Sequence, residues 1–202
     1  MNRCREKSAA MPEREYPPPP EQEDAAWVGR SRGVSKLYRD CSFESFVGGE
    51  KIVAYLRDAL KTDQSVVLRG PTGCGKTHLG ISMLKESDAY QWDRLFATVP
   101  ELLLKIRSSF NGGSSSEEEI IKEYATVPFL VLDDMGAEKT SEYSITTLYV
   151  ILDRRVRECL KTVITTNLSQ AEIESTFGAR IASRLAAMEN IKINMPDYRK
   201  KR

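Results

Sequence analysis

Residues 70–77 read Gly70-Pro71-Thr72-Gly73-Cys74-Gly75-Lys76-Thr77, which matches the phosphate-binding loop pattern G-x-x-x-x-G-K-[ST] at every fixed position. The glycines allow the backbone to curl so that its N–H groups point inward as a nest of donors. Lys76 is expected to place a positive charge near the β- and γ-phosphates, and the Thr77 hydroxyl to be a ligand of Mg²⁺. The stretch therefore predicts a site for a nucleoside triphosphate such as ATP.

The residues on either side of this loop support the same interpretation. Residues 65–69 form a short apolar run suited to a buried strand, and residues 77–87 can continue as a helix. The phosphates would then lie at the positive N-terminal end of that helix. We assign all eight loop residues and the adjoining His78 to the nucleotide site. His78 is expected to be a packed side chain, and Cys74 a small residue tolerated in the loop.

Length and charge set the limits of the remaining inferences. The 202 residues suffice for one well-buried domain plus a tail, but not for two full domains. Basic and acidic residues are balanced, at 30 and 29, so any surface that binds nucleic acid must be local.

The spacing of the cysteines and the hydropathy of the chain indicate its cellular compartment. The four cysteines have no C-x-x-C spacing and there is one histidine, which disfavours a zinc site. Their scattered positions fit a reducing compartment better than a disulfide framework. No apolar run approaches the roughly 18–20 residues that span a bilayer, and no signal-peptide core is evident. We expect a cytoplasmic protein without a membrane partner.

The chain divides into three parts by composition. Residues 1–40 contain the run Pro17–Pro20 among charged residues, which predicts a disordered or extended arm; a partner-docking segment that orders on binding is the alternative. Residues 41–197 carry the regular pattern of a folded nucleotide-binding domain. Residues 198–202 form a basic C-terminal tail.

Within the folded part, apolar runs typical of strands alternate with amphipathic stretches typical of helices. This alternation predicts an α/β fold in three layers, with a five-stranded parallel sheet and right-handed crossovers. The expected strands are 66–68, 95–99, 129–132, 162–165 and 191–193. The expected helices are 49–61, 77–87, 101–109, 116–123, 142–159 and 179–188. Capping boxes at Ser116-x-x-Glu119 and Ser169-x-x-Glu172 mark two helix starts.

Two carboxylates follow the third expected strand, in Phe129-Leu130-Val131-Leu132-Asp133-Asp134. Residues at the carboxyl edge of a parallel sheet face the ligand crevice. Asp133 is expected to hold Mg²⁺ through water, and Asp134 to polarise the attacking water as general base. The alternative is a turn or helix-cap aspartate after a core strand.

The fourth strand ends in the same way, with Asn167 after Thr162-Val163-Ile164-Thr165-Thr166. Its amide could hold the attacking water or a γ-phosphate oxygen, although an asparagine in this position is also a common turn residue. Arg180 and Arg184, four residues apart, share one helix face. They are either solvated or reach the γ-phosphate of a neighbouring subunit, where an arginine neutralises transition-state charge.

Together, four motifs resemble in order the signatures of DnaC/DnaI-type helicase loaders, which belong with the IstB-like AAA+ ATPases. They are the phosphate loop, Leu-Asp-Asp-Met-Gly-Ala-Glu (132–138), Thr-Thr-Asn (165–167) and Arg-Ile-Ala-Ser-Arg-Leu (180–185). The likeness extends over residues 34–199. It implies an AAA+ fold in which Asp133 and Asp134 are the Walker B residues and Asn167 is sensor 1. It further implies that Arg184, supported by Arg180, acts in a neighbouring subunit, and that residues 38–43 lie near the adenine.

The resemblance also implies partners. It predicts that the protein hydrolyses ATP in a Mg-dependent manner and self-associates when ATP is bound. It also predicts two further partners, single-stranded DNA and a hexameric replicative helicase. Lys105, Arg107 and Phe110 are candidates for the DNA contact. Two features depart from larger relatives: no C-terminal helical lid is expected after the last strand, and no helicase-binding domain is recognisable in residues 1–32. Arg199 is a weak candidate for a second sensor.

Three other functions stay open. An IstB-like transposition helper would use the same fold on a different client. A nucleotide-gated scaffold would bind ATP without significant hydrolysis, which the intact Lys76, Thr77, Asp133 and Asp134 disfavour. A small-molecule kinase is disfavoured because no segment for an acceptor or a lid is evident.

Overall fold

The computed structural model describes residues 33–87, 93–110, 115–137 and 141–198. Five parallel strands form one sheet in the order β2-β3-β4-β1-β5. The strands are β1 (Val66–Arg69), β2 (Arg94–Thr98), β3 (Phe129–Met135), β4 (Lys161–Thr166) and β5 (Glu189–Lys192). The helical elements are η1 (Lys36–Tyr38), α2 (Glu50–Leu60), α3 (Lys76–Glu86), α4 (Val99–Ser109), α5 (Glu117–Thr126), α6 (Glu142–Arg157) and α7 (Gln170–Ala186).

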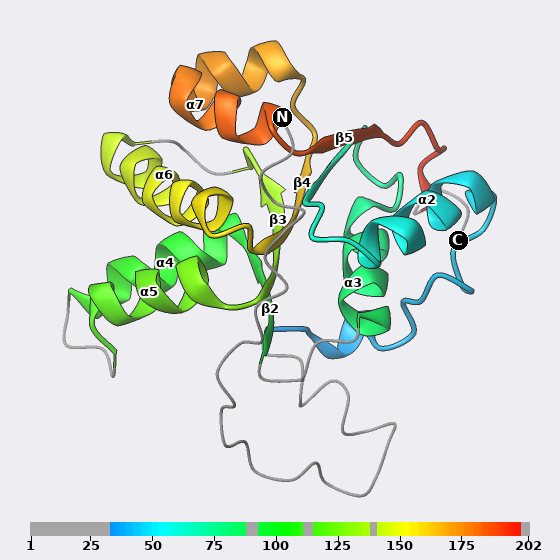
Figure 1. Cartoon of the computed structure of the whole chain (residues 1–202), viewed down its shortest axis with the longest axis horizontal. Helices are drawn as coiled ribbons and strands as arrows, with labels where there is room; N and C mark the ends of the chain where they lie inside the picture. Colours follow the sequence, from blue (N-terminus) through cyan, green and yellow to red (C-terminus); the bar gives the residue numbers. More distant parts are fainter. Residues whose placement is uncertain (1–32, 88–92, 111–114, 138–140, 199–202) are drawn as a thin grey trace, which may run out of the picture.

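The helices cover both faces of the sheet, which gives the expected three layers (Figure 1). On one face, α2 and α3 pack with Val66 and Leu68 of β1 into one apolar cluster. On the other face, α4 to α7 pack with Val67 of β1 and Leu132 of β3. Strands enclosed on both faces need apolar side chains on both, which explains the continuous apolar runs of β1, β3 and β4. The expected five-stranded α/β fold is therefore confirmed.

Several boundaries differ from the sequence expectation by a few residues. Strand β2 ends at Thr98 because the Thr98 side chain caps the N-terminus of α4. Helix α4 therefore begins at Val99, with Pro100 in its first turn. The last strand spans Glu189–Lys192 rather than 191–193. Both predicted capping boxes, at Ser116 and Ser169, are present.

Helix α7 is longer than expected and contains a kink. It begins at Gln170, and Gly178 interrupts it with φ 84° and ψ 162°. The predicted helix from Ala179 is therefore its second half, which carries both Arg180 and Arg184. No helix follows β5 among the described residues; the chain instead returns toward the phosphate loop.

Some residues before the expected domain boundary at residue 40 also pack on the domain. Val34 is buried, and the Tyr38 ring lies 6.0 Å from that of Phe96 in β2. Residues 1–32 of the predicted arm, and the tail from Arg199 onward, lie outside the described residues. Within the described part of the chain, no helix is both long and apolar enough to cross a membrane.

Candidate functional site

The phosphate loop connects β1 to α3 and depends on glycine at two positions. Gly73 and Gly75 have φ values of 79° and 92°. A Cβ on Gly73 would lie 1.9 Å from the Asp197 carboxylate, and one on Gly75 would lie 2.5 Å from the Phe46 ring. Any side chain would therefore be strained in its backbone and blocked by its neighbours.

The Lys76 side chain lies along this loop and is 5% exposed. Its Nζ donates to the carbonyl oxygens of Gly70 and Pro71 at 2.9 and 2.8 Å. It also donates to Oδ1 of Asn167 at 2.6 Å. The structure thus brings together two residues 91 positions apart that sequence reasoning assigned to one site.

Asp133 ends the apolar part of β3 and faces the start of α3. Its carboxylate accepts hydrogen bonds from Thr77 Oγ1 at 2.9 Å and from Thr165 Oγ1 at 2.6 Å, and the residue is 1% exposed. Loss of water around this carboxylate raises its pKa, and the nearby Asp134 charge adds to the rise, while both threonine hydroxyls oppose it.

Asp134 has an exposed side chain and a backbone in the left-handed region, with φ 57°. Its N–H donates to Thr165 Oγ1 at 3.0 Å. The register between β3 and β4 shifts between Leu132 and Met135, so this residue is turned away from the regular ladder. Aspartate tolerates such a φ better than most residues, and the turn places its carboxylate at the carboxyl edge of the sheet.

The oxygen atoms of Thr77 and Asp133 suit Mg²⁺, a hard cation that prefers oxygen ligands. Among the described residues, no group of three or more His, Cys, Asp or Glu side chains could form a metal cage. One hydroxyl and one carboxylate fit the pattern in which Mg²⁺ takes its remaining ligands from phosphates and water. These residues therefore fit the expected ion.

His78 packs the segment before α2 against α3. Its Nε2 lies 2.7 Å from the Ser42 carbonyl oxygen and 3.2 Å from Ser45 Oγ, and its ring is 5.5 Å from that of Phe46. Within the region expected near the adenine, the carbonyl oxygens of Arg39 and Ser42 contact Lys85 and His78 of α3, whereas the Tyr38 ring lies against Phe96 of β2.

Sequence reasoning missed two aromatic residues beside the loop. Phe46 lies against Gly75, and Tyr198 donates its N–H to the Gly73 carbonyl oxygen at 3.1 Å. Their rings are 6.1 Å apart, and the Tyr198 hydroxyl donates to the Val47 carbonyl oxygen. No periodic pattern links residues so distant in sequence, although the Gly48-Gly49 pair after Phe46 indicates a close approach of backbones.

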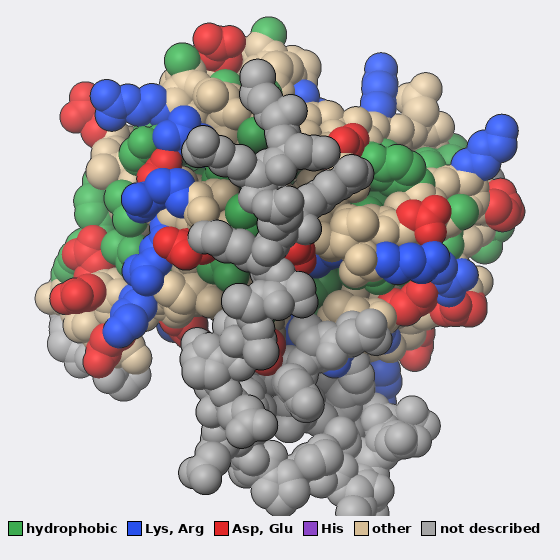
Figure 2. Space-filling model, in the orientation of Figure 1, with side chains coloured by type: hydrophobic (Ala, Val, Ile, Leu, Met, Phe, Trp, Pro, Cys, Tyr) green, Lys and Arg blue, Asp and Glu red, His purple; other side chains and the backbone are tan. Residues whose placement is uncertain are grey.

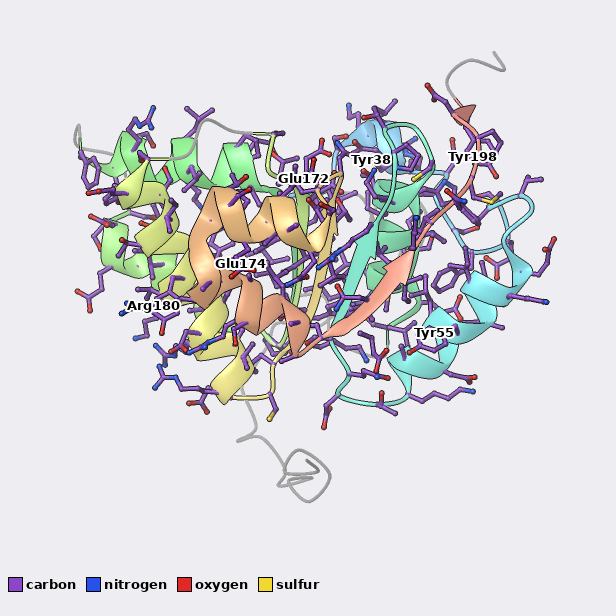
Figure 3. All side chains as sticks on the ribbon, turned by 90° about the horizontal axis from the view of Figure 1, so that it is seen from above. Tyr38, Tyr55, Glu172, Glu174, Arg180 and Tyr198 are labelled. Carbon is purple, nitrogen blue, oxygen red and sulfur yellow. The ribbon has the colours of Figure 1, made fainter. Side chains whose placement is uncertain are left out.

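Arg180 and Arg184 lie apart from their own chain's phosphate loop. Arg184 pairs with Asp153 of α6 at 2.7 Å, and Arg180 is exposed with its guanidinium 5.9 Å from the centre of the Tyr149 ring. Figure 3 places Arg180 on the α6 side of α7, far from Tyr198, which contacts the loop. The two arginines therefore do not complete the site of their own chain.

The three candidates for a DNA contact lie on or beside α4. Lys105 pairs with Glu123 of α5 at 3.2 Å, and Arg107 is exposed. Phe110 is 57% exposed and meets Tyr143 edge to face at 5.8 Å. Lys and Arg side chains gather along the edge of the molecule formed by α4 to α7 (Figure 2). The structure thus leaves Arg107 and Phe110 accessible and holds Lys105 in an ion pair.

Curated proteins similar to this chain include two replicative helicase loaders named DnaC. The one from Buchnera aphidicola subsp. Baizongia pistaciae is 29% identical over 185 residues, which cover 86% of this chain and 75% of that protein. The one from Escherichia coli K12 is 26% identical over 161 residues, 76% of this chain and 66% of that protein. This chain thus spans two thirds to three quarters of the length of these relatives.

Solved structures support the fold. A crystal structure of the DnaC helicase loader matches with a TM-score of 0.70 at 23% identity, covering 79% of this chain and all of that one. AMPPCP-bound DnaA from Aquifex aeolicus matches with a TM-score of 0.68 at 17% identity, over 76% of this chain and 49% of that one. A sequence profile of the IstB-like ATP binding proteins matches residues 37–201. The chain therefore belongs to the IstB-like ATP binding protein family and has the AAA+ fold.

Proposed function

We propose that this protein is a Mg-dependent ATPase that helps to load a replicative helicase onto single-stranded DNA. The observation that carries the ATPase part is that two hydrogen-bonded pairs, Lys76 with Asn167 and Thr77 with Asp133, meet at the start of α3. The similarity to DnaC helicase loaders supports a replicative helicase as the protein on which this ATPase acts. We further propose a cytoplasmic location, a domain spanning residues 41–197, a basic C-terminal tail and an N-terminal arm whose last residues, including Val34 and Tyr38, pack on that domain.

In this proposal, the loop N–H groups and Lys76 bind the triphosphate. Lys76 exchanges its bonds to the Gly70 and Pro71 carbonyl oxygens for phosphate oxygens, which are stronger partners because they are charged. Thr77 and Asp133 hold Mg²⁺, which supplies neutralisation of the charge that develops on the phosphates. Asp134 orients the attacking water and accepts its proton, and Asn167 fixes the position of that water or of a γ-phosphate oxygen.

The site is completed by a second copy of the chain. Arg184 stabilises the transition state in the neighbouring subunit, and Arg180 supports it. Support for this step is that both arginines lie away from their own phosphate loop, on a face that another subunit can reach. ATP binding then favours assembly, because the triphosphate supplies the anion that joins the two copies.

The assembled protein contacts single-stranded DNA through Arg107 and Phe110, with Lys105 nearby. A basic side chain and an exposed ring suit a strand whose phosphates are charged and whose bases can stack. These contacts and the docking of a hexameric helicase are proposals for the whole assembly.

A second candidate function is an IstB-like transposition helper. The observation that favours it is the family profile itself, which covers residues 37–201. Both functions use the same ATPase site and differ in the client protein. If the protein were instead a nucleotide-gated scaffold that binds ATP without significant hydrolysis, Asp134→Asn would leave ATP turnover unchanged.

Size-exclusion chromatography with light scattering separates these functions. The protein is mixed with the hexameric replicative helicase of the same organism, with an ATP analogue or with ADP. We expect a stable complex heavier than the helicase alone with the analogue, and loss of that complex for Lys76→Ala. A helicase that elutes alone while this protein self-associates would contradict the loader proposal and favour the transposition helper.

A further inference from the structure

The Arg184 side chain lies in a niche between α6 and α7. Its Nε and Nη2 both donate to Oδ1 of Asp153, at 3.0 and 2.7 Å. Nη2 also lies 3.3 Å from the Tyr149 hydroxyl oxygen, and the guanidinium carbon is 5.4 Å from the centre of the Tyr149 ring. Asp153 and Tyr149 are one helical turn apart on α6, so both contact the same guanidinium.

These contacts use one side of the guanidinium and leave another side available. Asp153 occupies the edge made by Nε and Nη2, whereas Nη1 has no hydrogen-bond partner among the described residues. The two N–H groups of Nη1 can therefore donate to an oxygen of a second anion. The Arg184 side chain is 31% exposed, so it is not closed off between α6 and α7.

Asp153 is itself held on both oxygens. Its Oδ2 lies 3.0 Å from Nε of Arg157, while Oδ1 bonds to Arg184. The hydrogen bond from Arg184 lowers the pKa of Asp153 below its ordinary value, and the charges of Arg157 and Arg184 contribute smaller decreases. The carboxylate thus stays ionised near neutral pH. The cluster of Asp153 with Arg157, Arg180 and Arg184 carries more positive than negative charge.

We infer that Asp153 is a positioning residue for Arg184, aided by Tyr149. Together they hold the guanidinium so that its Nη1 edge faces outward, toward a phosphate oxygen of a nucleotide bound by a second copy of this chain. This inference rests on the proposed function, because it takes Arg184 to act in the neighbouring subunit. Pre-orientation matters because a small displacement of a group that contacts the reacting atoms costs a large part of the rate.

The contacts could instead restrain Arg184 and keep it from the neighbouring site. The two roles differ in sign. A restraint predicts faster hydrolysis when Asp153 is neutralised, whereas positioning predicts slower hydrolysis with unchanged nucleotide affinity. The open Nη1 edge favours positioning, because a restraint that blocks the arginine would need to occupy the edge that binds phosphate.

A mixed-subunit ATPase assay tests the inference. Arg184→Ala protein serves as the acceptor, with an intact phosphate site but without the arginine. Asp134→Asn protein is the reference donor, which supplies Arg184 but does not hydrolyse ATP. Three further donors combine Asp134→Asn with a second change. Two of them carry Asp153→Asn or Asp153→Glu, and the third carries Arg157→Gln, the matched control that removes the other partner of the Asp153 carboxylate. Thermal unfolding checks that every donor is folded.

We expect the reference and Arg157→Gln donors to restore turnover to similar extents. The Asp153→Asn donor should restore about 10- to 100-fold less kcat, with KM for ATP unchanged. An Asp153→Glu donor should recover part of the loss. Activation by the Asp153→Asn donor that equals or exceeds activation by the reference donor would overturn the positioning role of Asp153. It would not affect the proposal that two copies share the site. If the reference donor itself fails to activate the acceptor, the shared site is wrong and the inference falls with it.

Discussion

At the scale of single residues, Lys76 joins the two parts of the site. Its Nζ contacts the phosphate loop on one side and Asn167, at the end of β4, on the other. The sequence pattern predicted that both residues serve one nucleotide. It could not predict that they touch directly, because such a contact depends on the order of strands in the sheet. Here β4 lies beside β1, which places Asn167 next to the loop.

Replacing Lys76 by alanine should abolish useful ATP binding. Two charge-assisted hydrogen bonds to phosphate oxygens are worth about 3 kcal/mol or more together, which corresponds to at least about a 100-fold rise in Kd. Isothermal titration calorimetry with ATP measures this change. The exposed Lys122→Ala on α5 is a control for loss of one positive charge. Unchanged affinity of Lys76→Ala for ATP would refute the assignment of the loop.

Asp133→Asn should stabilise the nucleotide-free protein while abolishing Mg-dependent turnover. Burial raises the pKa of this carboxylate above its unfolded value, so the folded state binds its proton more tightly. Stability from this residue is therefore greatest at acidic pH and falls as pH rises through the raised pKa. Asparagine is always neutral and avoids that loss.

Thermal unfolding of both proteins between pH 4 and pH 8 checks this effect. The Asn variant should have the higher Tm near neutral pH, and the difference should shrink as the pH is lowered. A difference that is negative near pH 7, or that does not change with pH, would show that the ionised carboxylate does not destabilise the fold.

At the scale of elements, local signals predicted most of the helices and strands. Capping boxes at Ser116 and Ser169 and apolar runs on β1, β3 and β4 found their elements because each signal acts within a few residues. The kink in α7 was missed, because the expected helix began only at Ala179 and Gly178 therefore lay outside it. The role of Arg155 was also missed, because an arginine on a helix normally faces water.

Gly178→Ala should destabilise the protein by about 1–3 kcal/mol. The position has φ 84° and ψ 162°, a region that only glycine adopts readily, and a Cβ there would meet no atom within 4 Å. The cost thus comes from the backbone and not from a clash. Urea unfolding measures it, with Ala179→Gly as a control expected to cost about 0.5–1 kcal/mol. An unchanged midpoint would mean that α7 straightens at little cost.

Arg155 is fully buried and joins α5, α6 and β4. Its guanidinium donates to the carbonyl oxygens of Tyr124, Val127 and Lys161 and to Thr162 Oγ1, at 2.7–2.9 Å. Burial lowers its pKa to about 9, which leaves it charged at neutral pH.

Arg155→Met should therefore reduce the free energy of unfolding by about 3 kcal/mol or more, because two buried carbonyl groups and one partly buried carbonyl group lose their donor. The neighbouring Arg154 is exposed, so Arg154→Met should change stability by less than about 0.5 kcal/mol. Chemical denaturation monitored by circular dichroism compares the two variants. Equal effects would contradict a structural role for the buried guanidinium.

At the scale of the whole molecule, the site is built from segments that lie far apart in sequence. Phe46 and Tyr198 flank the loop from opposite ends of the domain, and Arg184 lies on another face. Sequence motifs identified each catalytic candidate but not these neighbours, since aromatic packing carries no fixed spacing. The chain belongs to an ATP-binding family, and the site that two copies share is our proposal.

We propose that this protein places a helicase on DNA in an ATP-dependent manner. The most direct test is the amount of replicative helicase retained on circular single-stranded DNA after gel filtration, with and without this protein. Circular DNA has no end onto which a closed ring can thread. We predict retention with ATP and wild-type protein, and retention near the helicase-only level with Lys76→Ala. Equal retention in the presence and absence of the wild-type protein would show that it does not load the helicase.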